Sequence, residues 1–337
     1  MSYTGFPFLF PEDLGDENYL ASTEQVEFPP DPQPGDEDGQ AYLVAYAVNI
    51  IYNNLLQRHT NLRPADWINE DLSNLVAVCT KPHSEHENAL ILSYFSEVQV
   101  AQLRRMCGKA EGYLEQHHAD LMIKKLSEYA DFKRSGRKGR TYISHPPSAN
   151  SSAYVLTNNE TEPPKPTLMQ TLREFPYFEN YEHLTKLEYG LISPHLPPSI
   201  GTAAFIGSGP LPLSSLLTGM LMPGTKFLNL DRNKEALDAS KQLYTLLRKD
   251  DKNNQLPDMD FIQFNAGAAE NQPPPKGLKW QGVGLIFLAS LVGENMWQKM
   301  EILRGLRRFV RPGTLVAVRS AWGLRTLLYP VCFAPFP

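Results

Sequence analysis

The stretch AAFIGSGPLPLSS (Ala203–Ser215) decides the fold class of this chain. Its first part, with the preceding Thr202, is a short apolar run, typical of a strand that is buried on both faces of a parallel sheet. Gly207 and Gly209 follow as G-x-G, the beginning of a nucleotide-binding loop, because glycine accepts positive φ and lets a ligand approach the backbone. A lone G-x-G is a weak signal, so the prediction depends on what surrounds it.

Strands and helices alternate from Thr202 onward. The predicted strands are residues 202–206, 225–231, 259–264, 282–289 and 313–320. An apolar helix follows the glycine loop, and amphipathic helices are predicted at 234–249 and 296–310. This alternation predicts an α/β fold, a Rossmann-like, doubly wound and mostly parallel sheet over residues 201–337. Ligands of such sheets bind at the carboxyl ends of the strands.

The N-terminal part of the chain has a helical pattern instead. Apolar residues recur at spacings of three and four over residues 41–132 and 168–200, which predicts a helical domain that precedes the sheet. Residues 1–40 are acidic and rich in proline and are predicted to be a disordered tail. Residues 133–167 begin with KRSGRKGR and continue rich in Ser, Asn and Pro, which predicts an inserted, disordered loop.

Composition excludes several classes of function. The chain has 337 residues, 42% apolar and 20% charged, with a formal net charge of −5, which argues against nucleic acid or an acidic membrane as a partner. Its three cysteines are widely spaced and fit neither a disulfide framework nor a zinc site. Paired histidines have metal-like spacing but no evident third ligand, so we predict no metal site. The expected location is the cytoplasm, without a signal peptide or a membrane span.

Two prolines discriminate between the ligands of a glycine loop. Pro210 and Pro212 suit the first turn of a helix, where each removes an N–H donor that would otherwise bind pyrophosphate. A ligand without phosphate loses nothing by this. Asp231 stands 22 positions after Gly209, at the end of the second strand, where its carboxylate can accept hydrogen bonds from both ribose hydroxyls. The combination favours S-adenosylmethionine (SAM) over a dinucleotide.

Six separated motifs resemble the nicotianamine synthase family and follow the family's order. They are CGKAEGYLEQHH, FPYFENYEHLTKLE, FIGSGPLPLSS, FLNLD, IFLASLVG and VRSAWGLRTLLYP. They cover roughly residues 97–132 and 168–331, whereas the tail 1–40 and the loop 133–167 lie outside the resemblance, as would suit a fungal-type member.

The resemblance implies an unusual transferase reaction. Three SAM molecules condense by transfer of their 3-amino-3-carboxypropyl arms, three molecules of 5′-methylthioadenosine are released, and the product chelates transition metals. SAM is then the substrate and no further cofactor is implied.

The helical motifs supply the candidate catalytic residues. Glu111 and Glu115 lie four apart on one helix face, and Glu115 is the first choice for taking the proton from the attacking amine, with Glu111 second. The alternative is an ordinary solvated face. Tyr177 and Tyr181 can stack on adenine or face a sulfonium, or they are core aromatics. Phe178 stands where the family usually has tyrosine, which puts turnover or ring closure in doubt if that hydroxyl is catalytic.

The candidate SAM-binding residues follow the strands at their carboxyl ends. They are Gly207, Ser208, Gly209 and Pro210 of the loop, Asp231, Asn265, the run Ser290, Leu291 and Val292, and Arg319. Asn265 stands where the family carries an aspartate and can still accept a hydrogen bond from the adenine amine. Arg319 can clamp a substrate carboxylate, or it forms an ion pair.

The segment YPVCFAPFP ends the chain where the family continues with further strands. The fifth strand is therefore expected at an open edge, which a partner or an oligomer would have to cover. This departure keeps two alternatives open beside nicotianamine synthesis. One is a methyltransferase on the same SAM-binding domain, and the other is a SAM-binding remnant without catalysis.

Overall fold

The computed structural model describes residues 39–58, 60–135, 167–251, 255–268 and 278–332. The predicted tail 1–40 and loop 133–167 therefore lie almost entirely outside the described residues. Four helices precede the sheet: α2 (Gly39–Gln57), α3 (Asp66–Thr80), α4 (Glu85–Ser93) and α5 (Glu97–Ser135). Two more, α6 (Leu168–Leu172) and α7 (Phe178–Ile192), lead into it. No helix in these ranges has both the length and the apolar composition to cross a bilayer.

The rest of the described chain forms a parallel sheet of five strands and the helices that connect them. Its strands are β1 (Thr202–Ile206), β2 (Lys226–Asp231), β3 (Met259–Gln263), β4 (Val283–Leu288) and β5 (Leu315–Val318), in the order β3-β2-β1-β4-β5. The helices between them are α8 (Leu213–Leu221), α9 (Lys234–Asp250) and α10 (Met296–Arg307). The predicted α/β class with a helical N-terminal region is confirmed. Within the described residues β5 lies at one edge of the sheet.

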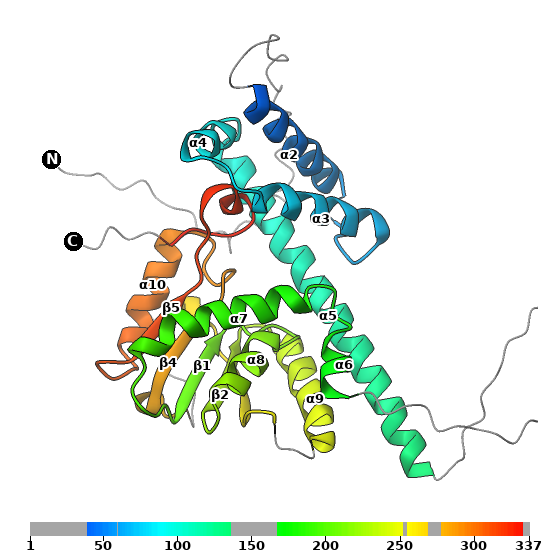
Figure 1. The fold of residues 1–337 in the computed structure, drawn as a ribbon, viewed down its shortest axis with the longest axis vertical. Coiled ribbons are helices and arrows are strands. Elements are labelled where there is room, and N and C mark those ends of the chain that lie inside the picture. Colours follow the sequence, from blue (N-terminus) through cyan, green and yellow to red (C-terminus); the bar gives the residue numbers. More distant parts are fainter. Residues whose placement is uncertain (1–38, 59, 136–166, 252–254, 269–277, 333–337) are drawn as a thin grey trace, which may run out of the picture.

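The two faces of the sheet are buried by different helices, as the alternation of side chains along a strand requires. Ala203 and Phe205 of β1 belong to a core that includes residues of α5, α7, α8 and α9. Ala204 and Ile206 face the opposite core, which α10 completes with Ile302 and Leu306. Figure 1 shows α7 and α8 in front of the strands, α9 to the right of them and α10 beside β4 and β5.

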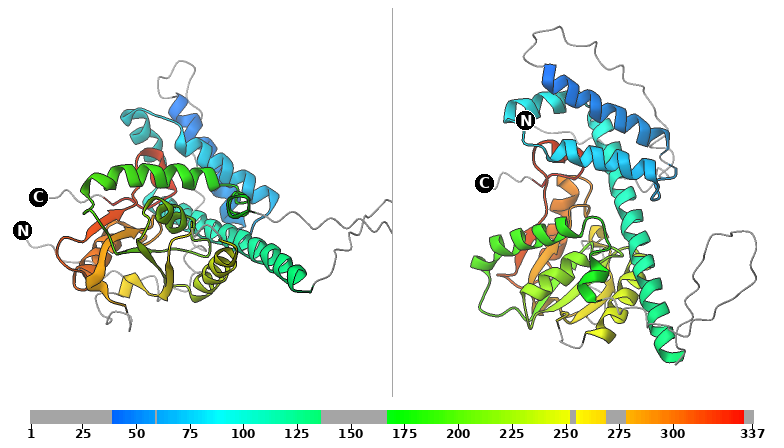
Figure 2. Two further views of the ribbon diagram at one scale, coloured as in Figure 1. Left: turned by 60° about the horizontal axis from the view of Figure 1, so that its bottom comes forward. Right: turned by 45° about the vertical axis from the view of Figure 1, so that its right-hand side comes forward.

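Helix α5 connects the N-terminal helices to the sheet. It runs the length of the molecule, with the α2–α4 group at one end and α9 packed along the other (Figure 2). The 3₁₀ turn η4 (Gly323–Leu327) returns from β5 to this group, where Leu324 and Leu327 are buried in a core of α2 to α5. The segment after β5 thus connects the sheet to the N-terminal helices.

One local prediction is wrong. Helix α8 begins at Leu213, so Pro210 lies in the loop before it and Pro212 is the N-cap rather than a first-turn residue. The residue before a proline is disfavoured in the helical conformation, which keeps Leu211 outside the helix. The glycine loop is therefore longer than the sequence implies, and it runs through Pro212.

The position of α8 depends on a close approach at Gly219. A Cβ there would lie 2.3 Å from Cγ of Pro257, in the segment before β3. We expect Gly219→Ala to lower the free energy of unfolding by about 1–3 kcal/mol through overpacking. Gly190→Ala on α7 is the matched control: nothing lies within 4 Å of its Cβ, and the better helix propensity should add up to about 1 kcal/mol. Chemical denaturation of both variants checks the pair, and equal effects would contradict the packing argument.

Candidate active site

The glycine loop leaves β1 in a conformation that requires glycine. Gly207 and Gly209 have φ of 81° and 64°, where a side chain would be strained. The N–H groups of Gly207 and Ser208 both donate to the carbonyl of Leu230 at the end of β2, at 2.7 and 3.2 Å. The loop is thereby fixed to the neighbouring strand. The hydroxyl oxygen of Ser208 is buried and has no hydrogen-bond partner in the described structure.

Asp231 ends β2 and is bound to the same loop. Its Oδ2 accepts from the N–H of Gly209 at 2.9 Å, and its Oδ1 accepts from the N–H of Asn233 at 2.9 Å. The N-cap of α9 is Asn233, whose side chain accepts from two N–H groups of the first turn. Asp231 is therefore free of a capping role, and its carboxylate is held beside the glycine loop.

The predicted acid Glu115 reaches this loop from α5. Its Oε2 would lie only 2.7 Å from a Cβ on Gly209, so a side chain at Gly209 would displace the carboxyl group of Glu115. Its Oε1 accepts a 2.6 Å hydrogen bond from the hydroxyl of Tyr181 on α7. Glu115, Tyr181 and the glycine loop come from three separate elements, and the structure brings all three together.

Burial is the main cause of the electrostatics of this group. It raises the pKa of Glu115 to about 8, with a further contribution from the charge of Glu111. Burial also raises the pKa of Glu111, while a hydrogen bond with Tyr329 acts against it. The pKa of Tyr181 lies well above its usual value, first through burial and then through the charge of Glu115. Near neutral pH the site thus contains a carboxyl group that has retained its proton.

The other predicted aromatic residues have different environments. Tyr177 is the residue before α7, and its ring contacts Phe175 edge to face, as does the ring of Tyr181. Phe178 is 2% exposed in the main core. Its ring faces the guanidinium of Arg173 at 5.7 Å. At this position the phenylalanine fills apolar space in the core.

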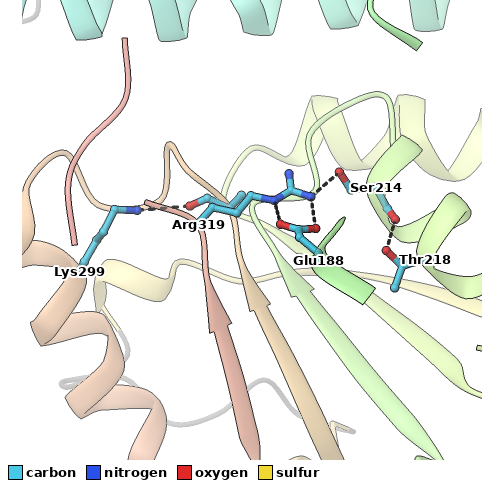
Figure 3. Close-up of polar contacts among 6 residues, drawn as sticks. Glu188, Ser214, Thr218, Lys299 and Arg319 are labelled. Atoms are coloured by element: carbon cyan, nitrogen blue, oxygen red, sulfur yellow. Dashed lines mark hydrogen bonds and ion pairs between the residues drawn. The ribbon is translucent and has the colours of Figure 1, made fainter. Parts of the chain in front are cut away.

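Arg319, which follows β5, is bound to a residue that the sequence analysis did not identify. Its Nε and Nη2 donate to the two carboxylate oxygens of Glu188 on α7, at 2.6 and 2.9 Å (Figure 3). Nη2 also donates to the hydroxyl of Ser214 on α8 at 3.0 Å. Both charged side chains are 14% exposed. The fork that was predicted to clamp a substrate carboxylate is engaged within the protein, and Figure 3 shows its remaining nitrogen directed away from Glu188.

The segment after β4 forms another wall. Leu291 packs against Gly108 of α5, and a Cβ on Gly207 would lie 2.3 Å from Cγ2 of Val292. Ser290 contributes a backbone carbonyl to a contact with α10. At the end of β3 the side chain of Asn265 is exposed, and its oxygen accepts from the N–H of Gly267 at 3.1 Å.

The acids of this site suit a ligand that carries a positive charge and an amino group from which a carboxylate can take a proton. Glu111, Glu115 and Asp231 are the acids of the site. The positive charge of Arg319 lowers the pKa of Glu115, but Arg319 is already paired with Glu188. A positive ligand would offset the charge of these acids as they ionise. No three His, Cys, Asp or Glu side chains gather as a metal site in the part of the chain that the structure describes.

Sequence reasoning missed Glu188 and Lys299, for which signals did exist. Glu188 lies seven residues after Tyr181, which places both on one face of α7. Lys299 occupies the helix face of Ile302 and Leu306, a position that the apolar pattern of α10 marks as buried.

The comparisons with known proteins agree on one family. The family model described as nicotianamine synthase protein matches residues 154–334. Nicotianamine synthase 9 of Hordeum vulgare is 30% identical over 273 residues, which are 80% of this chain and 64% of that relative, less than two thirds of its length. Nicotianamine synthase of Solanum lycopersicum is 31% identical over 277 residues, 82% of this chain and 70% of that relative. Both are plant proteins, so the fungal-type assignment stays a prediction.

Solved structures show a shared fold. MtNAS in complex with MTA and tNA gives a TM-score of 0.58 at 16% identity, over 85% of this chain and 86% of that chain. A glutamate-to-glutamine variant of MtNAS in complex with S-adenosylmethionine gives 0.56 at 15% identity, over 87% and 88%.

Loss of Glu188 should leave the guanidinium of Arg319 buried and uncompensated. We expect Glu188→Ala to lower the free energy of unfolding by about 3–5 kcal/mol. Glu182→Ala on the same helix removes only a partly exposed pair with Lys186, at 3.3 Å, and should cost about 0.3–0.5 kcal/mol. Urea unfolding of the two variants makes the comparison. Equal losses would show that the Arg319 pair is no more than a surface contact.

The raised pKa of Glu115 makes stability depend on pH. A folded pKa of about 8 against the ordinary 4.5 means that its favourable contribution is complete below pH 4.5 and is lost as the pH rises through 8. Glu115→Gln removes this titration. The free energy of unfolding of the variant should therefore rise relative to the ligand-free wild type between pH 5 and 8, by at most about 1.4 kcal/mol per pH unit for one proton. A difference that is flat across this range would contradict the assignment.

Proposed function

The chain belongs to the nicotianamine synthase family, and on that premise we propose that it transfers the 3-amino-3-carboxypropyl arm of SAM to an amine and so makes nicotianamine. The observation that carries the proposal is the Tyr181–Glu115 hydrogen bond of 2.6 Å, at a carboxyl group in contact with Gly209 of the ligand loop. A proton acceptor at that place serves an amine that attacks a ligand bound on the loop.

Binding of SAM follows from the loop and its surroundings. The ribose hydroxyls would donate to Asp231, whose carboxylate already holds the loop through Gly209. The backbone of Gly207 and Gly209 would carry the adenosyl group, beside the unpartnered hydroxyl of Ser208. The amino-acid arm would then extend toward Glu115, whose side chain reaches Gly209 of the loop from α5. The MtNAS complexes with S-adenosylmethionine and with MTA and tNA support this choice of ligand.

The chemical step forms one bond and breaks one. The nitrogen of an α-amino group attacks the γ-carbon of the arm, the C–S bond breaks, and its electron pair leaves with sulfur in 5′-methylthioadenosine. The amine proton passes to Glu115, which returns it to solvent before the next transfer. Two such steps join three arms, and a third attack within one arm closes the four-membered azetidine ring.

The second carboxyl group and the tyrosines tune the acceptor. Glu111, with its own raised pKa, disfavours a second negative charge at Glu115 until a cation is bound. The sulfonium of SAM lowers the pKa of Glu115, so that binding of the substrate produces the base that the reaction requires. Tyr181 donates to the ionised form and fixes the orientation of the carboxylate. Tyr177 would supply a ring for stacking.

The remaining nitrogen of Arg319 offers a single contact to a substrate carboxylate. Its other donors bind Glu188 and Ser214, so the carboxylate is held at one point rather than by a fork. Such a contact orients an arm and still releases it between successive transfers. This suits a reaction whose acceptor changes from SAM to an intermediate.

The test is incubation of the purified protein with SAM alone, followed by mass spectrometry of the products. We expect nicotianamine and three equivalents of 5′-methylthioadenosine. Glu115→Gln should keep SAM binding and lower the release of methylthioadenosine by about 10²–10⁴-fold, the usual contribution of a general base. Glu182→Gln on α7 is the control and should leave the rate unchanged.

Other products would identify the alternatives. S-adenosylhomocysteine in place of methylthioadenosine, when methyl acceptors such as amines and phenols are added to SAM, would indicate a methyltransferase. SAM binding without either product in both incubations would indicate a remnant that has lost catalysis. Unchanged turnover in Glu115→Gln would remove this residue from the mechanism.

A further inference from the structure

Lys299 of α10 lies in a buried environment that is unusual for a lysine. Among the described residues, Lys299 is the one charged residue that is completely buried, with 0% of its surface exposed. Such a side chain is found inside a protein only when its charge and its donors are satisfied, because desolvation of an ammonium is costly. The reason for its presence must therefore lie in what it touches.

Its ammonium is hydrogen-bonded to one short piece of backbone. Nζ donates to the carbonyls of Ser290 and Val292 at 2.8 Å each, and to the carbonyl of Ala289 at 3.4 Å. These residues follow β4 directly, and Figure 3 shows Lys299 reaching the end of the sheet from α10 while Arg319 extends in the other direction. An ammonium has three N–H donors, which matches the three carbonyls.

Three carbonyl oxygens that converge on one point repel each other unless a cation lies between them. The segment between β4 and α10 therefore requires the positive charge to keep its shape. Burial lowers the pKa of Lys299 to about 8, so the ammonium form predominates at neutral pH. The turn is closed by Gly293, whose φ of 82° and contact with the backbone of Lys299 exclude a side chain there.

The same segment touches both halves of the active site. Val292 packs on Gly207 of the ligand loop, and Leu291 packs on Gly108 of α5, where a Cβ on Gly108 would lie 3.2 Å from Cδ2 of Leu291. Gly108 shares a helix face with Glu111 and Glu115, three and seven residues further on. A displacement of the segment would therefore be felt at the SAM loop and at the acid-bearing helix.

We propose that Lys299 is a positioning residue for SAM binding: its ammonium holds segment 289–293 in the shape that seats Val292 against Gly207 and Leu291 against α5. The proposal rests on the proposed function, because it takes SAM as the ligand of the loop. Lys299 touches no substrate in this account and acts through the backbone carbonyls.

The decisive variant is Lys299→Met, which keeps an unbranched side chain, one atom shorter, and removes the donors and the charge. We expect the dissociation constant for SAM, measured by calorimetry, to rise at least tenfold, while kcat at saturating SAM stays within about threefold. Amide hydrogen exchange should become faster in peptides that cover 289–293 and stay unchanged in β1. Arg304→Met, an exposed change on the same helix, is the control and should alter neither quantity.

The split between binding and turnover separates positioning from mere stability. A variant that is only less stable would lower the folded fraction and hence the apparent kcat, and its folded molecules would bind SAM normally. A folded Lys299→Met protein with wild-type SAM affinity and wild-type exchange at 289–293 would overturn the proposal. If that variant does not fold, exchange on the wild type decides: slow exchange at 289–293, comparable to β4, supports the clamp, and fast exchange refutes it.

Failure of the proposed function would look different. In that case the wild type would release no methylthioadenosine from SAM, whereas the differences in SAM affinity and in exchange between the wild type and Lys299→Met would still report on the segment.

Discussion

The active site depends on the close contact between α5 and the loop after β1. Gly209 accepts a positive φ and has no Cβ, so the carboxyl group of Glu115 can lie directly on the loop backbone. Two further glycines repeat this principle, since Val292 packs on Gly207 and Leu291 on Gly108. The contact of α5 with the loop at Gly209, and the contacts of segment 289–293 with the loop and with α5, thus each involve a residue without a side chain. A larger residue at Gly209 would displace the carboxyl group of Glu115 from the loop.

The same contact buries Glu111 and Glu115 close together, which makes ionisation of either one unfavourable unless a positive charge is bound. Glu111 and Glu115 both have raised pKa values because burial penalises their charge. The guanidinium of Arg319 is already bound to Glu188 and Ser214, so it compensates them only from a distance. A sulfonium that enters the site would replace the missing positive charge. The buried acids would then have two effects: they favour binding of a cation, and the bound cation favours the ionised form of Glu115.

The sequence predicted the parts of this arrangement that depend on local pattern. The alternation of strand and helix, the turn at Gly207 and Gly209, and Asp231 at the end of β2 follow from spacing and backbone chemistry, and the structure contains each of them. Glu115 shares a helix face with Glu111, but it became a candidate only because the motif around the pair resembles the nicotianamine synthase family. The engagement of Arg319 by Glu188 could not be predicted, because the two residues lie 131 positions apart and meet only when α7 packs over the sheet.

Lys299 and Arg319 both hold the backbone that follows a strand, after β4 and after β5 respectively. The backbone that leaves a parallel strand at its carboxyl end has lost its sheet partners, and in a binding site water cannot replace them all. After β4 the carbonyls converge on the ammonium of Lys299. After β5 the chain is secured by the N–H of Arg319, which donates to the carbonyl of Leu288 at 3.0 Å, while its side chain binds α7 and α8. Each cation is supplied or anchored by an element outside the strand, so the backbone at this end of the sheet is ordered by the fold itself. Walls that are ordered in folding need not be ordered again on binding, which lowers the entropic cost of binding a ligand.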